Sequence, residues 1–244
     1  IWQNIKKDLF FNGNYCSENE KFDQYLKRFG YNFKSENKEL AGYAILSNKK
    51  IILAVDIGPT PSKNFSNYYQ AGSLSFEIFS NDKKLISNCG YFSDSKNKLN
   101  KLSKSTAAHS TLIIDDFSSC SFTKKDSKII IDKGLKILKR NIIFEDNYWK
   151  ISATHDGYFQ KFGCNHEREI EFYPDEMKFV GYDKILRKNP NGNIKFDIRF
   201  HLDPISKIMK TQDNKSIFIE LDDEGWKFSC ENFEINIDNG LYFG

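Results

Sequence analysis

Apolar and polar residues alternate along most of this chain in short runs separated by polar turns. In "FDIRFHL", residues 196–202, every second residue is apolar, so the side chains at 196, 198 and 200 are expected on one face of a strand and the others on the opposite face. "GYAILSNKKIILAVDIG" and "GSLSFEIFSNDKKLISNCG" each place two apolar runs around a polar turn, which predicts a β-hairpin. "YPDEMKFVGYD" predicts a third hairpin, with Pro174 and Asp175 at its tip.

This rhythm continues to the C-terminus, and no stretch after residue 40 keeps a helical period over three turns. Many short strands at nearly regular spacing predict an all-β fold, an antiparallel multi-stranded β-sandwich. The segments "PTPSKNFSN" and "SDSKNKLNKLSKST" are expected to be loops between strands, the second one long and charged.

The first 39 residues have a different texture. "ENEKFDQYLKRFG" spaces its apolar residues as one face of a helix does and ends at Gly30. We expect residues 1–39 to form a short helical connector and residues 40–244 to form the sandwich. The chain begins without Met, so we expect it to be the later part of a longer protein, whose upstream part can hold a signal peptide.

The charge and composition limit the class of partner. The chain has 36 basic and 33 acidic residues, and this near balance predicts neither nucleic acid nor an anionic membrane surface as a partner. We also expect no membrane span, because no apolar run is long enough for one. Aromatic residues make up 15% of the chain, which suits pleated, half-buried strands.

Motif searches remove several classes of chemistry. The sequence contains no P-loop and no GxGxxG, GxSxG or HExxH, so nucleotide binding, serine hydrolysis and zincin-type proteolysis have no motif support. The five cysteines are widely spaced without a CxxC pair, which argues against a disulfide framework or a zinc ribbon and favours free thiols. They are Cys16, Cys89, Cys120, Cys164 and Cys230.

Two of the four histidines are best explained by structure. His201 follows the alternation of its predicted strand, and a histidine in a sheet usually makes a hydrogen bond. His166 precedes Glu167 and Arg168, so a ladder of cross-strand ion pairs accounts for it.

The string "HDGY" has two interpretations. Asp156 and Gly157 predict a turn, and the turn alone is a sufficient explanation of the string. Alternatively, His155 and Tyr158 lie at the rim of a sheet, where an imidazole and a phenol can contact a sugar.

His109 has the most suggestive surroundings, in "STAAHSTLIIDD". Small and hydroxyl-bearing neighbours leave room for a metal ion or a ligand. Zinc requires three protein ligands of His, Cys or carboxylate type, and the residues themselves do not select the other two. A histidine that packs and forms hydrogen bonds remains the alternative.

Six strings in order resemble the heparinase II/III-like family, and more narrowly its alphaproteobacterial branch. They are "GYAILSNKKIILAVDIGPTP", "QAGSLSFEIF", "LISNCG", "STAAHSTLIIDD", "HDGYFQKFGCNHEREI" and "IRFHL". The resemblance covers about residues 40–244 and implies an N-terminal α/α toroid followed by a C-terminal sandwich of the super-sandwich type. This chain resembles the second part, and the connector would come from the toroid.

The resemblance also implies an activity, that of a polysaccharide lyase acting on glycans that contain uronic acids. In β-elimination a base removes the C5 proton, a neutralising group stabilises the enolate and an acid protonates the leaving oxygen. Most of these groups lie on the toroid in the family, so the isolated chain is expected to be inactive. The implied partners are an acidic polysaccharide or cell-envelope glycan and the protein's own toroid. The implied location is the bacterial periplasm or cell envelope, with the cytoplasm as an alternative.

The family sandwich usually holds zinc, and its ligand positions correspond here to Gln70, Asn88 and His109. An Asp near the first ligand falls on Gly72, and a His credited with catalysis in some members falls on Tyr68. Amide oxygens are neutral and weak zinc ligands, so we expect no tight zinc binding. This set would instead form internal hydrogen bonds or touch a sugar.

Two functions therefore stay open: a lyase domain, or a diverged sandwich that binds glycan or is purely structural. Arg168 and Arg199 can pair with uronate carboxylates, and cross-strand ion pairing is the alternative for both. The candidate residues are Tyr68 and His109 for catalysis, His155, Tyr158 and Arg168 for substrate binding, and His109, Asn88 and Gln70 for a metal.

Overall fold

The computed structural model describes residues 38–125, 128–189 and 192–243. The helix predicted within residues 1–39, together with Cys16, lies outside the described residues. All strand pairs between the described residues are antiparallel, which confirms the predicted fold class.

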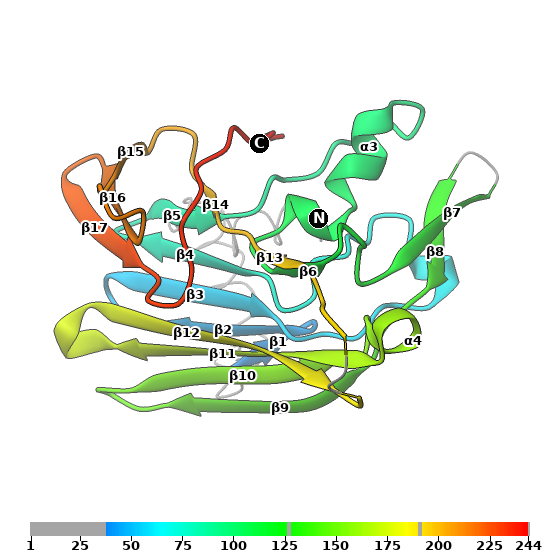
Figure 1. Cartoon of the computed structure of the whole chain (residues 1–244), viewed down its shortest axis with the longest axis horizontal. Helices are drawn as coiled ribbons and strands as arrows, with labels where there is room; N and C mark the ends of the chain where they lie inside the picture. The colour runs from blue at the N-terminus through cyan, green and yellow to red at the C-terminus, as the bar shows by residue number, and fades with distance from the viewer. Residues whose placement is uncertain (1–37, 126–127, 190–191, 244) are drawn as a thin grey trace, which may run out of the picture.

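Two large sheets form the body of the molecule (Figure 1). The six-stranded sheet has the order β1-β2-β3-β4-β5-β14, and its strands are β1 (Glu39–Leu40), β2 (Tyr43–Ser47), β3 (Ile51–Asp56), β4 (Phe76–Ser80), β5 (Lys83–Ser87) and β14 (His201–Leu202). The four-stranded sheet has the order β12-β11-β10-β9, and its strands are β9 (Ile137–Phe144), β10 (Trp149–His155), β11 (Cys164–Tyr173) and β12 (Lys178–Arg187).

Smaller elements complete the described part of the chain. The strands are β6 (Leu112–Ile114) with β13 (Phe196–Ile198), β7 (Ser121–Lys125) with β8 (Lys128–Lys133), and β15 (Lys207–Lys210), β16 (Ser216–Leu221) and β17 (Glu224–Ser229). The helical elements are η1 (Lys63–Phe65), α3 (Lys98–Ser103), η2 (Thr106–Ala108), α4 (Phe159–Phe162) and η3 (Pro174–Glu176).

The main core lies between the two large sheets, because each sheet turns one apolar face inward. Along β3 the side chains of Ile51, Leu53 and Val55 are buried while their neighbours are half-buried. Ile151 of β10 and Phe172 of β11 belong to the same cluster, and side chains of β16 and β17 extend it. Each fully buried aliphatic side chain contributes about 1.5–3 kcal/mol relative to exposure.

All three predicted hairpins are present. Between β2 and β3, the side-chain oxygen of Asn48 accepts a hydrogen bond from the backbone of Ile51 at 2.8 Å. Between β4 and β5, Asn81 and Asp82 adopt positive φ angles of 43° and 64°, as the two central residues of a type I′ turn do. Between β11 and β12, η3 begins at Pro174.

The segment predicted to be a long charged loop contains the helix α3. Asn97 caps this helix, because its side-chain oxygen accepts a hydrogen bond from the backbone of Leu99 at 3.0 Å. The side chains of Asn100 and Ser103 are buried beneath the helix. The helix spans six residues, which is too short to produce a periodic apolar signal. The second predicted loop likewise includes the short element η1.

The strict alternation expected for residues 196–202 is wrong as a description of one strand. β13 ends at Ile198 and pairs with β6, whereas β14 begins at His201 and pairs with β5. The chain therefore passes from one sheet to another at Arg199 and Phe200, and the ring of Phe200 is 37% exposed. Local sequence cannot reveal this change, because two different partner strands cause it.

Among the described residues, no helix has the length and apolar character that crossing a bilayer requires.

Candidate functional site

The three segments that carry the predicted metal positions lie side by side. Gln70 reaches Gly90, two residues after Asn88, and the side chain of Asn88 reaches Ser110, the residue after His109. Gln70 lies between β3 and β4, Asn88 directly follows β5, and His109 directly follows η2. The three segments therefore adjoin, although no hydrogen bond joins the three candidate side chains directly.

Gln70 is held by its amide nitrogen. Nε2 donates to the backbone oxygen of Gly90 at 2.9 Å and to that of Ser103 at 2.7 Å. Both amide protons are therefore used in tying the segment around residue 70 to the two neighbouring segments.

Asn88 is held at both ends of its amide. Its Oδ1 accepts a hydrogen bond from the backbone of Ser110 at 2.8 Å, and its Nδ2 donates to Oε1 of Glu77 at 3.1 Å. Burial raises the pKa of Glu77, while the charge of Lys84 and these bonds to Asn88 act in the opposite direction. The amide oxygen that would face a metal is thus already engaged.

His109 is buried, with 5% of its surface exposed. Nδ1 donates to the backbone oxygen of Ser105 at 2.8 Å, which leaves Nε2 as the nitrogen with a free lone pair. Burial lowers the pKa of His109 to about 4, so the imidazole is neutral at physiological pH. Gly72 is required beside it, because a Cβ on Gly72 would lie 2.5 Å from Cδ2 of His109.

The donor set at these positions does not fit a zinc ion. Two of the three side chains are neutral amides, the oxygen of Asn88 already accepts a hydrogen bond, and His109 offers one nitrogen. In the described part of the chain, no group of three or more His, Cys, Asp or Glu side chains is arranged to hold a metal.

His201 lies next to this cluster and has the structural role interpreted from the sequence. Its Nε2 donates to the backbone oxygen of Ala107 at 3.0 Å, and its Nδ1 lies 3.3 Å from the sulfur of Cys89. Burial raises the pKa of Cys89 to about 11, so this sulfur remains a thiol and acts as a hydrogen-bond donor.

Tyr68 differs from every other predicted site residue, all of which lie in the described part of the chain. It is exposed, with 68% of its surface accessible, whereas the others are buried or half-buried. Its ring meets that of Tyr91 edge to face, with 6.1 Å between centroids and 72° between planes.

His155 and His166 form a buried chain of hydrogen bonds. The backbone of Gly157 donates to Nδ1 of His155, so Nε2 of His155 carries the proton and donates to Nδ1 of His166 at 3.2 Å. Nε2 of His166 in turn donates to Oδ1 of Asp183 at 2.6 Å. Burial lowers the pKa of both histidines, although for His166 the carboxylate of Asp183 acts in the opposite direction.

Arg168 extends this chain across the sandwich. It forms an ion pair with Asp183, the residue directly opposite on β12, which confirms the cross-strand interpretation of Arg168. Its Nη1 donates to the backbone oxygens of Leu74 at 2.9 Å and Ser110 at 2.6 Å. Leu74 has a positive φ of 60°, so the guanidinium secures a strained position as well as the residue next to His109.

The "HDGY" string forms the predicted turn, and its two candidate side chains face the interior. Tyr158 is 1% exposed, and its hydroxyl donates to the backbone oxygen of Leu112 at 2.9 Å. His155 is also 1% exposed. As positioned here, these side chains connect β10 to β6 and β11 and present no surface to a sugar. Arg199, by contrast, is partly exposed and lies 3.7 Å from Asp116 and 3.6 Å from Asp197.

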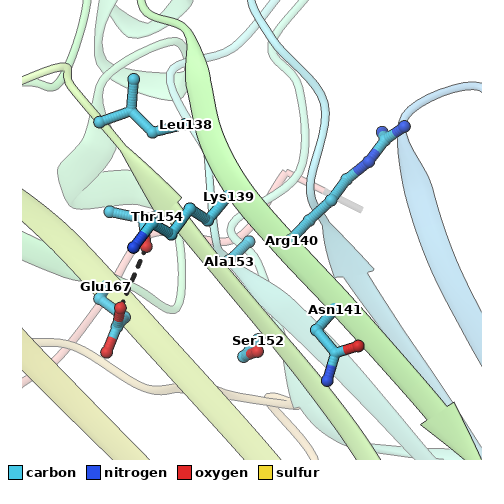
Figure 2. A pocket seen from close by; sticks show the side chains of 8 residues that line it. All are labelled: Leu138, Lys139, Arg140, Asn141, Ser152, Ala153, Thr154 and Glu167. Carbon is cyan, nitrogen blue, oxygen red and sulfur yellow. Dashed lines mark hydrogen bonds between the residues drawn. The ribbon is translucent and has the colours of Figure 1, made fainter.

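Sequence reasoning missed an open hollow on the four-stranded sheet. Side chains of β9, β10 and β11 line a hollow of about 540 Å³, drawn in Figure 2. Lys139 extends toward Thr154, and Thr154 donates to Oε2 of Glu167 at 3.2 Å. The signal was present as outward polar positions in the alternation of β10, which also suits an ordinary solvated face.

Sequence reasoning also missed Lys104. It appeared as one more charge in a loop, yet its side chain is buried, with 1% of the residue exposed. Nζ donates to the backbone oxygens of Asn67 at 2.5 Å and Tyr69 at 3.0 Å. Burial lowers the pKa of Lys104 to about 8.

The family comparison identifies this antiparallel sandwich as a polysaccharide lyase-related domain. Residues 34–244 match the profile of the family described as Heparinase II/III-like, C-terminal, and the chain belongs to that family. The chain is similar to FtsZ-localized protein C of Caulobacter vibrioides, with 22% identity over 216 residues that cover 83% of this chain and 37% of that protein.

The fold is similar to a solved structure of a heparinase III. The TM-score is 0.58 at 15% sequence identity, and the match covers 88% of this chain and 34% of that one. At this identity the likeness shows the fold alone. The chain spans about a third of the length of both relatives.

Proposed function

We propose that this chain is the C-terminal domain of a polysaccharide lyase-like protein that cleaves uronic-acid-containing glycans by β-elimination. Family membership supports the class of reaction. The observation that supports a role for this domain in the reaction is the exposure of Tyr68. Tyr68 is the candidate catalytic residue with a freely accessible side chain, and it lies two residues before the hydrogen-bonded Gln70.

In this proposal the domain provides one wall of the substrate cleft. Elimination requires a base at C5, a group that stabilises the enolate and an acid for the leaving oxygen. A phenol can donate a proton, so Tyr68 is the group that we assign to the leaving glycosidic oxygen. The other groups would come from an α/α toroid preceding residues 40–244. His109 is buried and neutral, and we assign it a positioning role.

The proposed substrate and location follow from the family. The partner would be an acidic polysaccharide of the cell envelope or of glycosaminoglycan type, and the place of action the bacterial periplasm or envelope. The hydrogen-bonded amides at residues 70 and 88 support a reaction in which this domain uses no metal.

The test is a lyase assay on the protein at its full natural length. Polygalacturonate, alginate and hyaluronate are the substrates, and ultraviolet absorbance reports the unsaturated product. We expect turnover of at least one polymer, and a fall of about 100-fold or more in Tyr68→Phe, because general acid catalysis contributes that much. Tyr182→Phe, which alters an exposed tyrosine on β12, is the matched control. Absence of product from the wild-type protein would contradict the proposal.

A second candidate function is a diverged module without catalysis. The observation that favours it is that hydrogen bonds hold the side chains of Gln70, Asn88 and His109 to neighbouring backbone. We propose in this case that the domain binds a cell-envelope glycan or braces its own toroid. The similarity to FtsZ-localized protein C adds that the parent protein would localise with FtsZ. Retention on glycan without turnover, together with loss of a fluorescent fusion from midcell when FtsZ is depleted, would support this function over the first.

A further inference from the structure

We infer that Tyr68 and Tyr91 form an aromatic corner that stacks against the apolar face of a pyranose ring, and that Lys104 and Gln70 hold this corner from beneath. The ligand class rests on the proposed function, whereas the corner itself rests on the contacts described below. Its geometry is that of a floor and a wall, with the two rings 72° apart and 6.1 Å between centroids.

The first observation is the exposure of Tyr68. A phenolic ring that is 68% exposed leaves apolar surface in water that the fold does not use. Tyr91 beside it is half-buried, and its hydroxyl accepts a hydrogen bond from Nδ2 of Asn100 at 3.2 Å. Tyr91, the wall of the corner, is therefore fixed, whereas Tyr68, its floor, is open to solvent. Flat C–H faces of sugar rings bind against aromatic rings of this kind, and ligand sites are typically lined by aromatic side chains.

The second observation is the way in which Lys104 grips the backbone. Its two acceptors, Asn67 and Tyr69, are the residues on either side of Tyr68. None of the ion pairs formed by the described residues includes Lys104, so this cation is buried without a carboxylate. Burying such a charge is costly, and the structure offsets the cost with the two carbonyls and with the ring of Tyr91, whose centroid lies 5.5 Å from Nζ.

The third observation is the link between the two rings and the substituted metal position. Gln70 binds Gly90, the residue before Tyr91, and also Ser103, the residue before Lys104. The backbone of Ala71 donates to the oxygen of Lys104 at 2.8 Å. The segments that carry Tyr68, Tyr91 and Lys104 are thus joined to one another by these hydrogen bonds. This arrangement preorganises the corner, which reduces the entropy lost on binding.

The chemistry of the corner determines which part of a sugar it binds. Lys104 is buried and does not reach a ligand, so the corner recognises the ring face and not a carboxylate. The contribution of the aromatic corner to binding should therefore stay the same when the salt concentration is raised, unlike that of a charged contact. A carboxylate of the same sugar would be recognised elsewhere in the protein.

The test is binding of the full-length protein to oligosaccharides of galacturonate, alginate and hyaluronate by titration calorimetry at low and high salt. We expect Tyr68→Ala and Tyr91→Ala to weaken binding about tenfold, by the same factor at both salt concentrations. Tyr68→Phe retains the ring and should bind like the wild type. Tyr182→Ala is the control for loss of an exposed tyrosine. Thermal unfolding of each variant establishes that it is folded.

Three results would overturn the corner: wild-type affinity in Tyr68→Ala and Tyr91→Ala, an equal loss in Tyr182→Ala, or no binding of any oligosaccharide by the wild type. Lyase turnover is measured on the same samples and separates the two proposals. Normal binding with lost turnover in Tyr68→Phe supports both. Binding that depends on the two rings in a protein without turnover supports the corner and removes the lyase function.

Discussion

Arg168 and Asp183 face each other on neighbouring strands and form a buried, two-point ion pair. Nε of Arg168 donates to Oδ1 of Asp183 at 2.8 Å, and Nη2 donates to Oδ2 at 2.9 Å. Burial would raise the pKa of Asp183, but the guanidinium and the hydrogen bond from His166 hold it below its usual range. Because Nη1 also binds Leu74 and Ser110, one side chain connects the four-stranded sheet to the segment behind His109.

Replacing Arg168 by Met should destabilise the sandwich by about 3–5 kcal/mol, because it leaves the carboxylate of Asp183 buried without a cation. Arg199→Met is the control, since Arg199 makes weak, partly exposed pairs at 3.6 and 3.7 Å and should change stability by less than about 1 kcal/mol. Urea unfolding followed by the fluorescence of the buried Trp149 measures both. Equal effects of the two substitutions would show that the ion pair does not hold the sheets together.

Acid should loosen β10 and β11. The folded-state pKa values of His155 and His166 are lowered, so the unfolded chain binds more protons than the folded one below about pH 6.5. Their contribution to stability is present above that pH and is lost as the pH falls through the folded-state values. Arg168 faces both histidines and disfavours their protonation, whereas the carboxylate of Asp183 favours that of His166.

The measurement for this prediction is hydrogen exchange of the β10 and β11 amides at pH 7 and pH 5, corrected for intrinsic rates. We expect lower protection at pH 5, and a smaller difference in His155→Gln, which removes one titrating group. His109 adds to the same trend, because a shift from 6.5 to about 4 corresponds to roughly 3 kcal/mol. Protection that is unchanged or greater at pH 5 would contradict the assignment of neutral buried histidines.

Lys104→Met should release the backbone around Tyr68. The substitution keeps the length of the side chain but leaves the oxygens of Asn67 and Tyr69 without a donor, at a cost of about 1–3 kcal/mol for each buried acceptor. We expect faster exchange of the amides at residues 67–71. Lys101→Met, on the exposed face of α3, is the matched control and should leave that segment unchanged. If the two variants exchange alike, Lys104 does not position Tyr68.

Purified protein should contain far less than one zinc ion per chain after dialysis. Gln70 and Asn88 supply neutral amides, and both are already hydrogen-bonded. Elemental analysis of the wild type and of His109→Ala measures this directly. Stoichiometric zinc that disappears in His109→Ala would show that the cluster is a working metal site.

The strands were predictable because alternation reports which face of a sheet is buried, as Ile51, Leu53 and Val55 illustrate. Interactions that depend on the register between strands could not be predicted. The partnership of Arg168 with Asp183 requires the exact pairing of β11 and β12, and the role of Lys104 requires contacts from segments more than thirty residues away. A charged residue in a polar string gives no sign of burial when its partners are distant backbone oxygens.

The hydrogen bonds of the candidate site residues could not be predicted from the sequence. The resemblance indicated which segments meet, and Gln70, Asn88 and His109 do lie on adjoining segments. Whether an amide points toward a metal or a carbonyl depends on side-chain geometry, which sequence does not contain. Tyr68 is the converse case, since a position named by resemblance proved to be the accessible one.

The most direct test of the central claim is the rate of unsaturated product formation from uronate polymers by the full-length wild-type protein and by Tyr68→Phe. The account predicts measurable elimination by the wild type and a loss of about 100-fold in the variant, with glycan binding unchanged. A full-length protein that binds these glycans without forming product would contradict it and identify the sandwich as a diverged, non-catalytic module.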